Sequence, residues 1–109
     1  MKPHTTLTKG KIRKMAMVIL SMEYGHEVWI NNNIAVRGRA FIGRKGVSDI
    51  AGFCRLTGRA SYTEVKAVGD ILSKEQKDFL NQVKQAGGFA FLAEQNEYGK
   101  VIITEYVNR

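Results

Sequence analysis

The sequence is poor in cysteine, proline and long apolar runs, and each shortage excludes a class of protein. Its single cysteine, Cys54, can form neither an intramolecular disulfide nor a cysteine-based zinc site, so we expect a reducing, intracellular environment. One proline in 109 residues argues against a proline-rich disordered chain. The longest apolar run, residues 15–22, is far shorter than the roughly 20 residues of a membrane-spanning helix. We therefore expect a single soluble domain, residues 1–109, in the cytoplasm and with no membrane partner.

Acidic side chains are also scarce, but only in the first part of the chain. Residues 1–45 carry nine basic and two acidic side chains, whereas residues 46–109 carry eight of each, so the net charge of +7 belongs to the N-terminal part. Four of these basic residues follow one another closely around glycines that let a backbone approach a phosphate. They are Arg37, Arg39, Arg44 and Lys45. We predict that they contact the backbone of DNA, with a solubilising surface as the alternative.

The periodicity of apolar residues predicts an α/β fold. Three- and four-residue steps of apolar residues favour helices, and short β-branched or aromatic runs bounded by glycines favour strands. The expected helices span residues 9–23 and 74–86, and the expected strands span 27–30, 50–54, 60–66, 89–93 and 100–107. We expect Trp29 and Cys54 to fill the core and His26 to lie at a surface or in a turn. The alternative for Trp29 is stacking on an unpaired base.

Two carboxylates and one ammonium have the spacing that a metal-dependent nuclease requires. Glu64 and Lys66 share one face of their strand because strand side chains alternate, and Asp49 borders the preceding strand. Carboxylate oxygens are the ligands that Mg²⁺ or Mn²⁺ prefers, and a lysine offsets charge on an attacked phosphate. The alternative is an exposed neutralising pair formed by Glu64 and Lys66, which is common on strands.

Gln76 has two possible roles. Ser73 and Gln76 fit a capping box, in which the Gln76 side chain reaches back to the Ser73 amide. The other possibility is that Gln76 faces the carboxylates across the sheet. The pattern alone leaves both open.

The order of these motifs resembles the VRR-NUC branch of the PD-(D/E)XK nuclease superfamily. The motifs are Gly46-Val47-Ser48-Asp49-Ile50, Glu64-Val65-Lys66, the segment from Leu72 to Leu80 with Gln76, and Ala86-Gly87-Gly88. Together they extend over roughly residues 10–105. Asp49 and Glu64 are 15 positions apart, which suits two adjacent strands and a turn.

The resemblance implies a restriction-endonuclease-like core, with a mixed central sheet flanked by helices. It also implies a metal-dependent endonuclease that hydrolyses DNA, in which Asp49, Glu64 and the Val65 carbonyl hold Mg²⁺ or Mn²⁺. Lys66 and Gln76 would complete the catalytic site. Minimal members of this branch, often from phages, resemble Holliday-junction resolvases and act as homodimers. A four-way DNA junction is therefore the expected substrate, in a bacterial or phage-infected cell.

The chain departs from the family pattern at two positions. Ser48 replaces the proline of the PD motif, and Lys9 stands where members have a metal-binding glutamate in the first helix. Glu23 and Glu27 would replace that glutamate only with a differently oriented helix. The departure at Lys9 keeps one alternative open, a DNA-binding module of the same fold without cleavage. A further alternative, independent of Lys9, is a nuclease of the same fold that cuts flaps or duplex ends.

Overall fold

A computed structural model describes residues 5–31 and 46–108 of the chain. The basic residues Arg37, Arg39, Arg44 and Lys45 lie outside these ranges, as does His4. The described residues form two helices and five strands in an αβββαββ order. These elements are α1 (Lys9–Met22), β1 (His26–Ile30), β2 (Ile50–Cys54), β3 (Ala60–Lys66), α2 (Lys74–Gln85), β4 (Phe89–Gln95) and β5 (Val101–Glu105).

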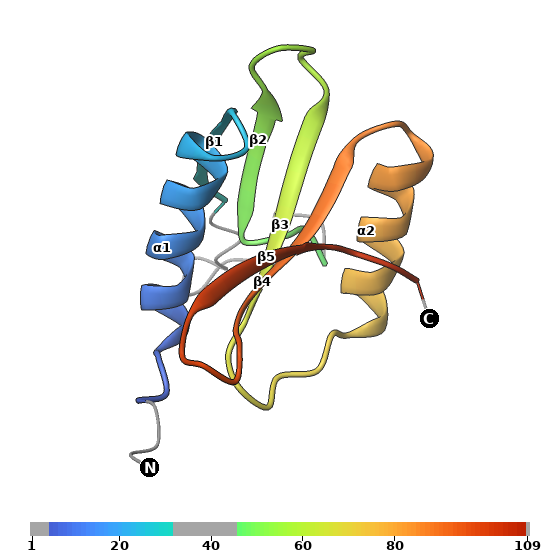
Figure 1. Ribbon diagram of the computed structural model, residues 1–109. Helices are drawn as coiled ribbons and strands as arrows, with labels where there is room; N and C mark the ends of the chain where they lie inside the picture. The colour runs from blue at the N-terminus through green and yellow to red at the C-terminus, as the bar shows by residue number, and fades with distance from the viewer. Residues whose placement is uncertain (1–4, 32–45, 109) are drawn as a thin grey trace, which may run out of the picture.

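The strands form one mixed sheet with the order β1-β2-β3-β4-β5. Consecutive strands pair antiparallel except β3 and β4, which are parallel. A parallel pair needs a crossover connection, and α2 provides it between these two strands. Figure 1 shows α1 and α2 on opposite sides of the sheet. The α/β fold and the mixed sheet flanked by helices are confirmed, and they are consistent with a restriction-endonuclease-like core.

Each helix buries its apolar side against one face of the sheet. On the first face, Ile12, Ala16 and Leu20 of α1 pack with Ile50, Val65 and their neighbours on the other strands. On the second face, α2 packs through three buried residues, Phe79, Leu80 and Val83, against Ala90 and Tyr106. The alternation of strand side chains therefore assigns Val65 to the α1 face and its neighbours Glu64 and Lys66 to the α2 face.

The bounds of the elements agree closely with the periodicity of the sequence. Strands β2 and β3 have the predicted bounds, both helices end one residue earlier than predicted, and β5 is shorter at both ends. Helix α1 begins where the Thr8 hydroxyl accepts a hydrogen bond from the Lys11 amide. Helix α2 begins at the predicted capping box of Ser73 and Gln76.

Two predictions about single residues are wrong. His26 is 3% exposed, because it opens β1 beneath Phe89 and Phe91 and its Nδ1 lies 2.8 Å from Ser61 Oγ. Trp29 is 49% exposed, because it lies on the α2 face of β1 and α2 packs on β3 and β4 instead. Cys54, at the end of β2, is half-buried and has a free thiol. Within residues 5–31 and 46–108, no helix is long and apolar enough to cross a membrane.

Candidate active site

Asp49 and the motif Glu64-Val65-Lys66 meet at the end of the β2–β3 hairpin that faces the start of α2. Pairing of β2 with β3 begins at Ile50 and Thr63, so Asp49 stands just outside the ladder. Its Oδ2 accepts a hydrogen bond from the Val65 amide at 3.1 Å. This contact holds the Asp49 carboxylate against β3, beside Glu64.

Gly46 fixes the approach of the chain to Asp49. It has a positive φ of 85°, and an added Cβ there would collide with the backbone of Glu75 in the first turn of α2. Only glycine combines this backbone conformation with so close a contact. The segment that leads into β2 is thereby packed directly against the N-terminus of α2, which carries Gln76.

Gln76 performs both of the roles that the sequence left open. Its side-chain Oε1 accepts a hydrogen bond from the backbone amide of Ser73 at 2.8 Å, and its backbone amide donates to Ser73 Oγ at 3.1 Å. Its Nε2 donates to Glu64 Oε1 at 2.8 Å. A glutamine offers both an acceptor and a donor, so one side chain caps α2 and orients the carboxylate.

Glu64 is a carboxylate in an unfavourable position. It is 2% exposed, and within the described part of the chain its Oε2 has no hydrogen-bond partner. Burial, followed by the charge of Asp49, raises the pKa of Glu64 to about 8, and the charge of Lys9 acts in the opposite direction. Two carboxylates that repel each other, with one buried oxygen unsatisfied, have the chemistry of a cation site.

The backbone of Val65 adds a further oxygen at this point. In an extended strand the N–H and C=O of one residue point toward the same neighbour. The N–H of Val65 points to Asp49, so its carbonyl is directed to the same edge. The residues at this edge thus fit a divalent metal held by Asp49, Glu64 and the Val65 carbonyl. This ligand set has only two carboxylate side chains, and no group of three or more His, Cys, Asp or Glu residues that could hold a metal occurs among the described residues.

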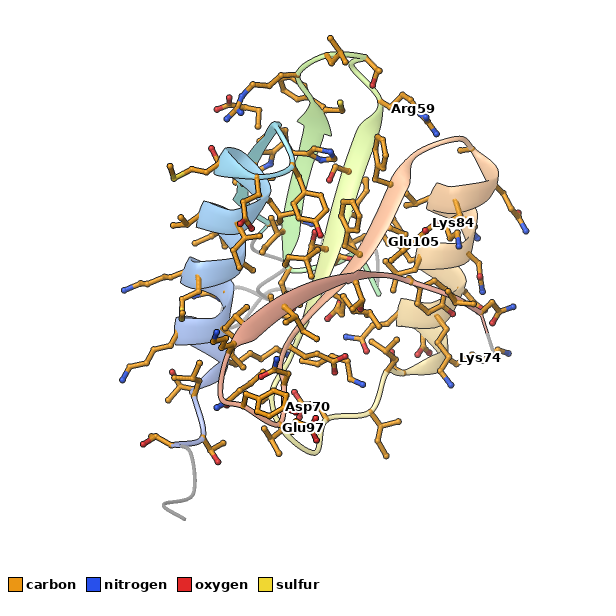
Figure 2. The ribbon with its side chains drawn as sticks, viewed as in Figure 1. Arg59, Asp70, Lys74, Lys84, Glu97 and Glu105 are labelled. Carbon is orange, nitrogen blue, oxygen red and sulfur yellow. The ribbon has the colours of Figure 1, made fainter. Side chains whose placement is uncertain are left out.

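Two charged residues complete the surroundings of Asp49. Lys9, at the start of α1 and 47% exposed, places its Nζ 4.0 Å from Asp49 Oδ2 and 3.9 Å from Asp70 Oδ2. Asp70 lies in the loop that leaves β3, where its carboxylate also accepts a hydrogen bond from the Ala67 amide at 3.0 Å. Figure 2 shows Asp70 at this end of the sheet and Arg59 at the opposite end.

The structure therefore brings together Asp49, Glu64, Val65 and Gln76, and Lys66 follows Glu64 on the same face of β3. Asp70 was not expected at the site, and its only signal in the sequence is its position four residues after Lys66. The two other acidic candidates lie elsewhere. Glu23 caps the C-terminal end of α1, and Glu27 pairs with Arg55 at 3.1 Å.

This geometry agrees with a comparison of the sequence with known families. The VRR-NUC domain matches residues 34–96, which is more than half of the chain. The chain belongs to the VRR-NUC family. These are nucleases of the PD-(D/E)XK type, so membership implies a hydrolase that acts on the phosphodiester bonds of DNA. No curated protein and no solved structure matches the chain.

Proposed function

We propose that this protein is a metal-dependent endonuclease that cuts branched DNA, with a four-way junction as its substrate. One observation carries the proposal. The buried Glu64 Oε2, which has no hydrogen-bond partner among the described residues, lies beside the Asp49 carboxylate, at the edge to which the Val65 carbonyl is directed. A divalent cation replaces the proton that the raised pKa of Glu64 otherwise keeps there, and it supplies the missing partner of Oε2.

The residues of the site divide the work between them. Asp49, Glu64 and the Val65 carbonyl hold Mg²⁺ or Mn²⁺, which supplies Lewis-acid polarisation of a phosphate and acidification of a water molecule. Gln76 keeps Glu64 in its orientation through the 2.8 Å hydrogen bond to Oε1. Lys66 shares the face of β3 with Glu64, and its ammonium offsets negative charge that develops on the attacked phosphate.

In this proposal the protein recognises DNA by charge and shape. The basic residues Arg37, Arg39, Arg44 and Lys45, which the family match includes, bind the phosphate backbone in this proposal. Binding should then weaken steeply with salt. The protein would act inside a bacterial or phage-infected cell, where the free thiol of Cys54 stays reduced.

A junction needs two cuts, so the proposal includes a homodimer. The outer side of α1 supports an interface between two copies. Met15, Val18 and Met22 lie three and four residues apart on this helix and are 46%, 56% and 80% exposed. Light scattering of the wild type and of Val18→Glu tests it. A wild type that stays monomeric at tens of micromolar contradicts the dimer.

The decisive experiment is cleavage of a labelled four-way junction, a flap and a linear duplex with Mg²⁺, Mn²⁺ or EDTA. We expect paired, symmetric cuts in the junction that disappear in EDTA and in Asp49→Asn. Lys66→Ala should also abolish cutting while retaining DNA binding. Preferential cutting of flaps or duplexes would overturn the junction assignment, and normal cutting by both variants would overturn the site.

A second candidate function is DNA binding without cleavage. Lys9 supports it, because its ammonium already provides a positive charge 4.0 Å from Asp49 Oδ2. A binding-only protein has no need for a metal. Calorimetric titration with Mn²⁺ separates the candidates: the nuclease binds Mn²⁺ and loses this binding in Asp49→Asn, whereas the binding module takes up none.

A further inference from the structure

A cavity of about 450 Å³ opens beside Lys66 on the face of the sheet that α2 covers. Its walls come from four elements, β3, α2, β4 and β5, and from residues just outside α2 and β5. Lys66 lies at the end of β3, and Leu92 and Glu94 lie on β4. Leu72 directly precedes the N-cap of α2, and Lys77 lies near the start of that helix. Residues 104–107, at the end of β5, close the far side.

The cavity adjoins the carboxylates but does not coincide with them. Glu64 pairs in register with Leu92, which pairs with Thr104 on β5, so the row that holds Glu64 continues into the cavity wall. Asp49 lies on the other side of β3, toward β2. Lys66 belongs to both, because it shares the face of Glu64 and lines the cavity. A group bound in the cavity therefore lies next to the strand row that holds Glu64.

The lining contains both apolar and charged side chains. Leu72, Leu92 and Val107 form an apolar surface, and two lysines, Lys66 and Lys77, supply positive charge. One of the two carboxylates, Glu105, is paired with Lys84 at 3.5 Å, and Figure 2 shows these two side by side near α2. The volume lies in the range of small-molecule sites, roughly 300–1,000 Å³, and is too small for a duplex.

We propose that this cavity binds a single unpaired nucleotide of the substrate. Its phosphate lies between Lys66 and Lys77, and its base lies against the leucines, where Glu94 accepts a hydrogen bond from an exocyclic amino group. The inference rests on the proposed function, because it takes the ligand to be part of the nucleic acid that is cut. It narrows the proposed substrate to a junction that has an unpaired nucleotide beside the cleaved bond.

Titration with mononucleotides tests the cavity without metal or cleavage. In EDTA, 2′-deoxycytidine 5′-phosphate should bind at least about fivefold more tightly than 2-deoxyribose 5-phosphate, because burial of the base against apolar side chains contributes roughly 1 kcal/mol or more. Binding is followed by calorimetry and by NMR shifts of Leu92 and Val107. Equal affinities of the two compounds would overturn the proposal, since the cavity would then bind only an anion.

Matched variants locate the two halves of the nucleotide. Lys77→Met should weaken both compounds, and Lys74→Met, a lysine at the start of the same helix outside the cavity, should weaken neither. Thr104→Phe, at an exposed position of β5, should reduce the nucleotide to the affinity of the sugar phosphate. Val107→Phe provides a second blocked variant if Thr104→Phe does not fold. Loss of binding in Lys74→Met equal to that in Lys77→Met refutes a defined site.

The two proposals fail in different ways. Asp49→Asn should stop cleavage and leave binding of the mononucleotide unchanged. If the wild type cuts no DNA but binds the nucleotide with the expected dependence on Lys77, the cavity stands and the nuclease assignment falls. If it cuts continuous duplex as fast as a branch with unpaired nucleotides and binds no mononucleotide, the cavity assignment falls and the nuclease stands.

Discussion

Replacing Glu64 by glutamine should stabilise the metal-free protein, and increasingly so as the pH rises. The pKa of Glu64 is raised from 4.5 to about 8 in the fold. The folded state therefore holds a proton that the unfolded state releases above pH 4.5, so wild-type stability is greatest below that pH and is lost as the pH rises to 8. Each unit of the shift corresponds to about 1.4 kcal/mol, so the loss is roughly 3–5 kcal/mol. Glutamine does not titrate, and it retains the acceptor for Gln76.

The assay is urea unfolding in EDTA at pH 5, 6, 7, 8 and 9. We expect the wild type to lose stability across this range and Glu64→Gln to stay level, so that the curves separate by several kcal/mol at pH 8. Mg²⁺ should restore the wild type at pH 8 and leave Glu64→Gln unchanged. Glu97→Gln removes a carboxylate from an exposed turn and serves as the control. Parallel curves for the wild type and Glu64→Gln would refute the argument that Glu64 is buried beside a second carboxylate.

Three further predictions concern Lys9, His26 and Gly46. Lys9→Met should tighten Mn²⁺ binding roughly fivefold in calorimetry. The reason is that an ammonium 4.0 Å from Asp49 Oδ2 disfavours a bound cation by about 1 kcal/mol at this half-exposed position. The control Lys14→Met, on the exposed side of α1, should leave Mn²⁺ affinity unchanged, and an equal gain in affinity there would exclude a local effect. Burial, followed by the charge of Arg55, lowers the pKa of His26, so the fold should lose stability as pH falls below 6.5 while His26→Gln does not; identical acid unfolding curves would contradict this. Gly46→Ala should destabilise the protein by more than about 1 kcal/mol and reduce cleavage, because the methyl group meets the backbone of Glu75; wild-type thermal stability would show that this contact is absent.

The positions of the secondary structure follow from patterns that neighbouring residues set. Strands β2 and β3 have the predicted bounds because alternation over five to seven residues depends only on side chains two apart. The cap at Ser73 is equally local, since its two hydrogen bonds join residues three apart. The proximity of Asp49 to the Glu64-Val65-Lys66 motif was predictable from the sequence as well, because a single hairpin brings the two motifs together.

The surroundings of these residues follow from contacts between distant segments, which no local pattern contains. His26 is buried because residues 35–65 positions later in the chain, Ser61 and the aromatic rings of β4, pack against it. Trp29 is exposed because α2 covers β3 and β4 rather than β1.

The sequence by itself determined the elements, the capping box and the spacing of Asp49, Glu64 and Lys66, all of which are properties of short stretches of chain. Only the tertiary structure decided that Glu64 is buried with one oxygen lacking a hydrogen-bond partner in residues 5–31 and 46–108. It also decided that Lys9 lies between Asp49 and Asp70 and that a cavity opens beside Lys66. Burial and charge at a point depend on every element that packs there, and here the charge of Lys9, on α1, acts on Glu64, which lies on β3 more than 50 residues later in the chain.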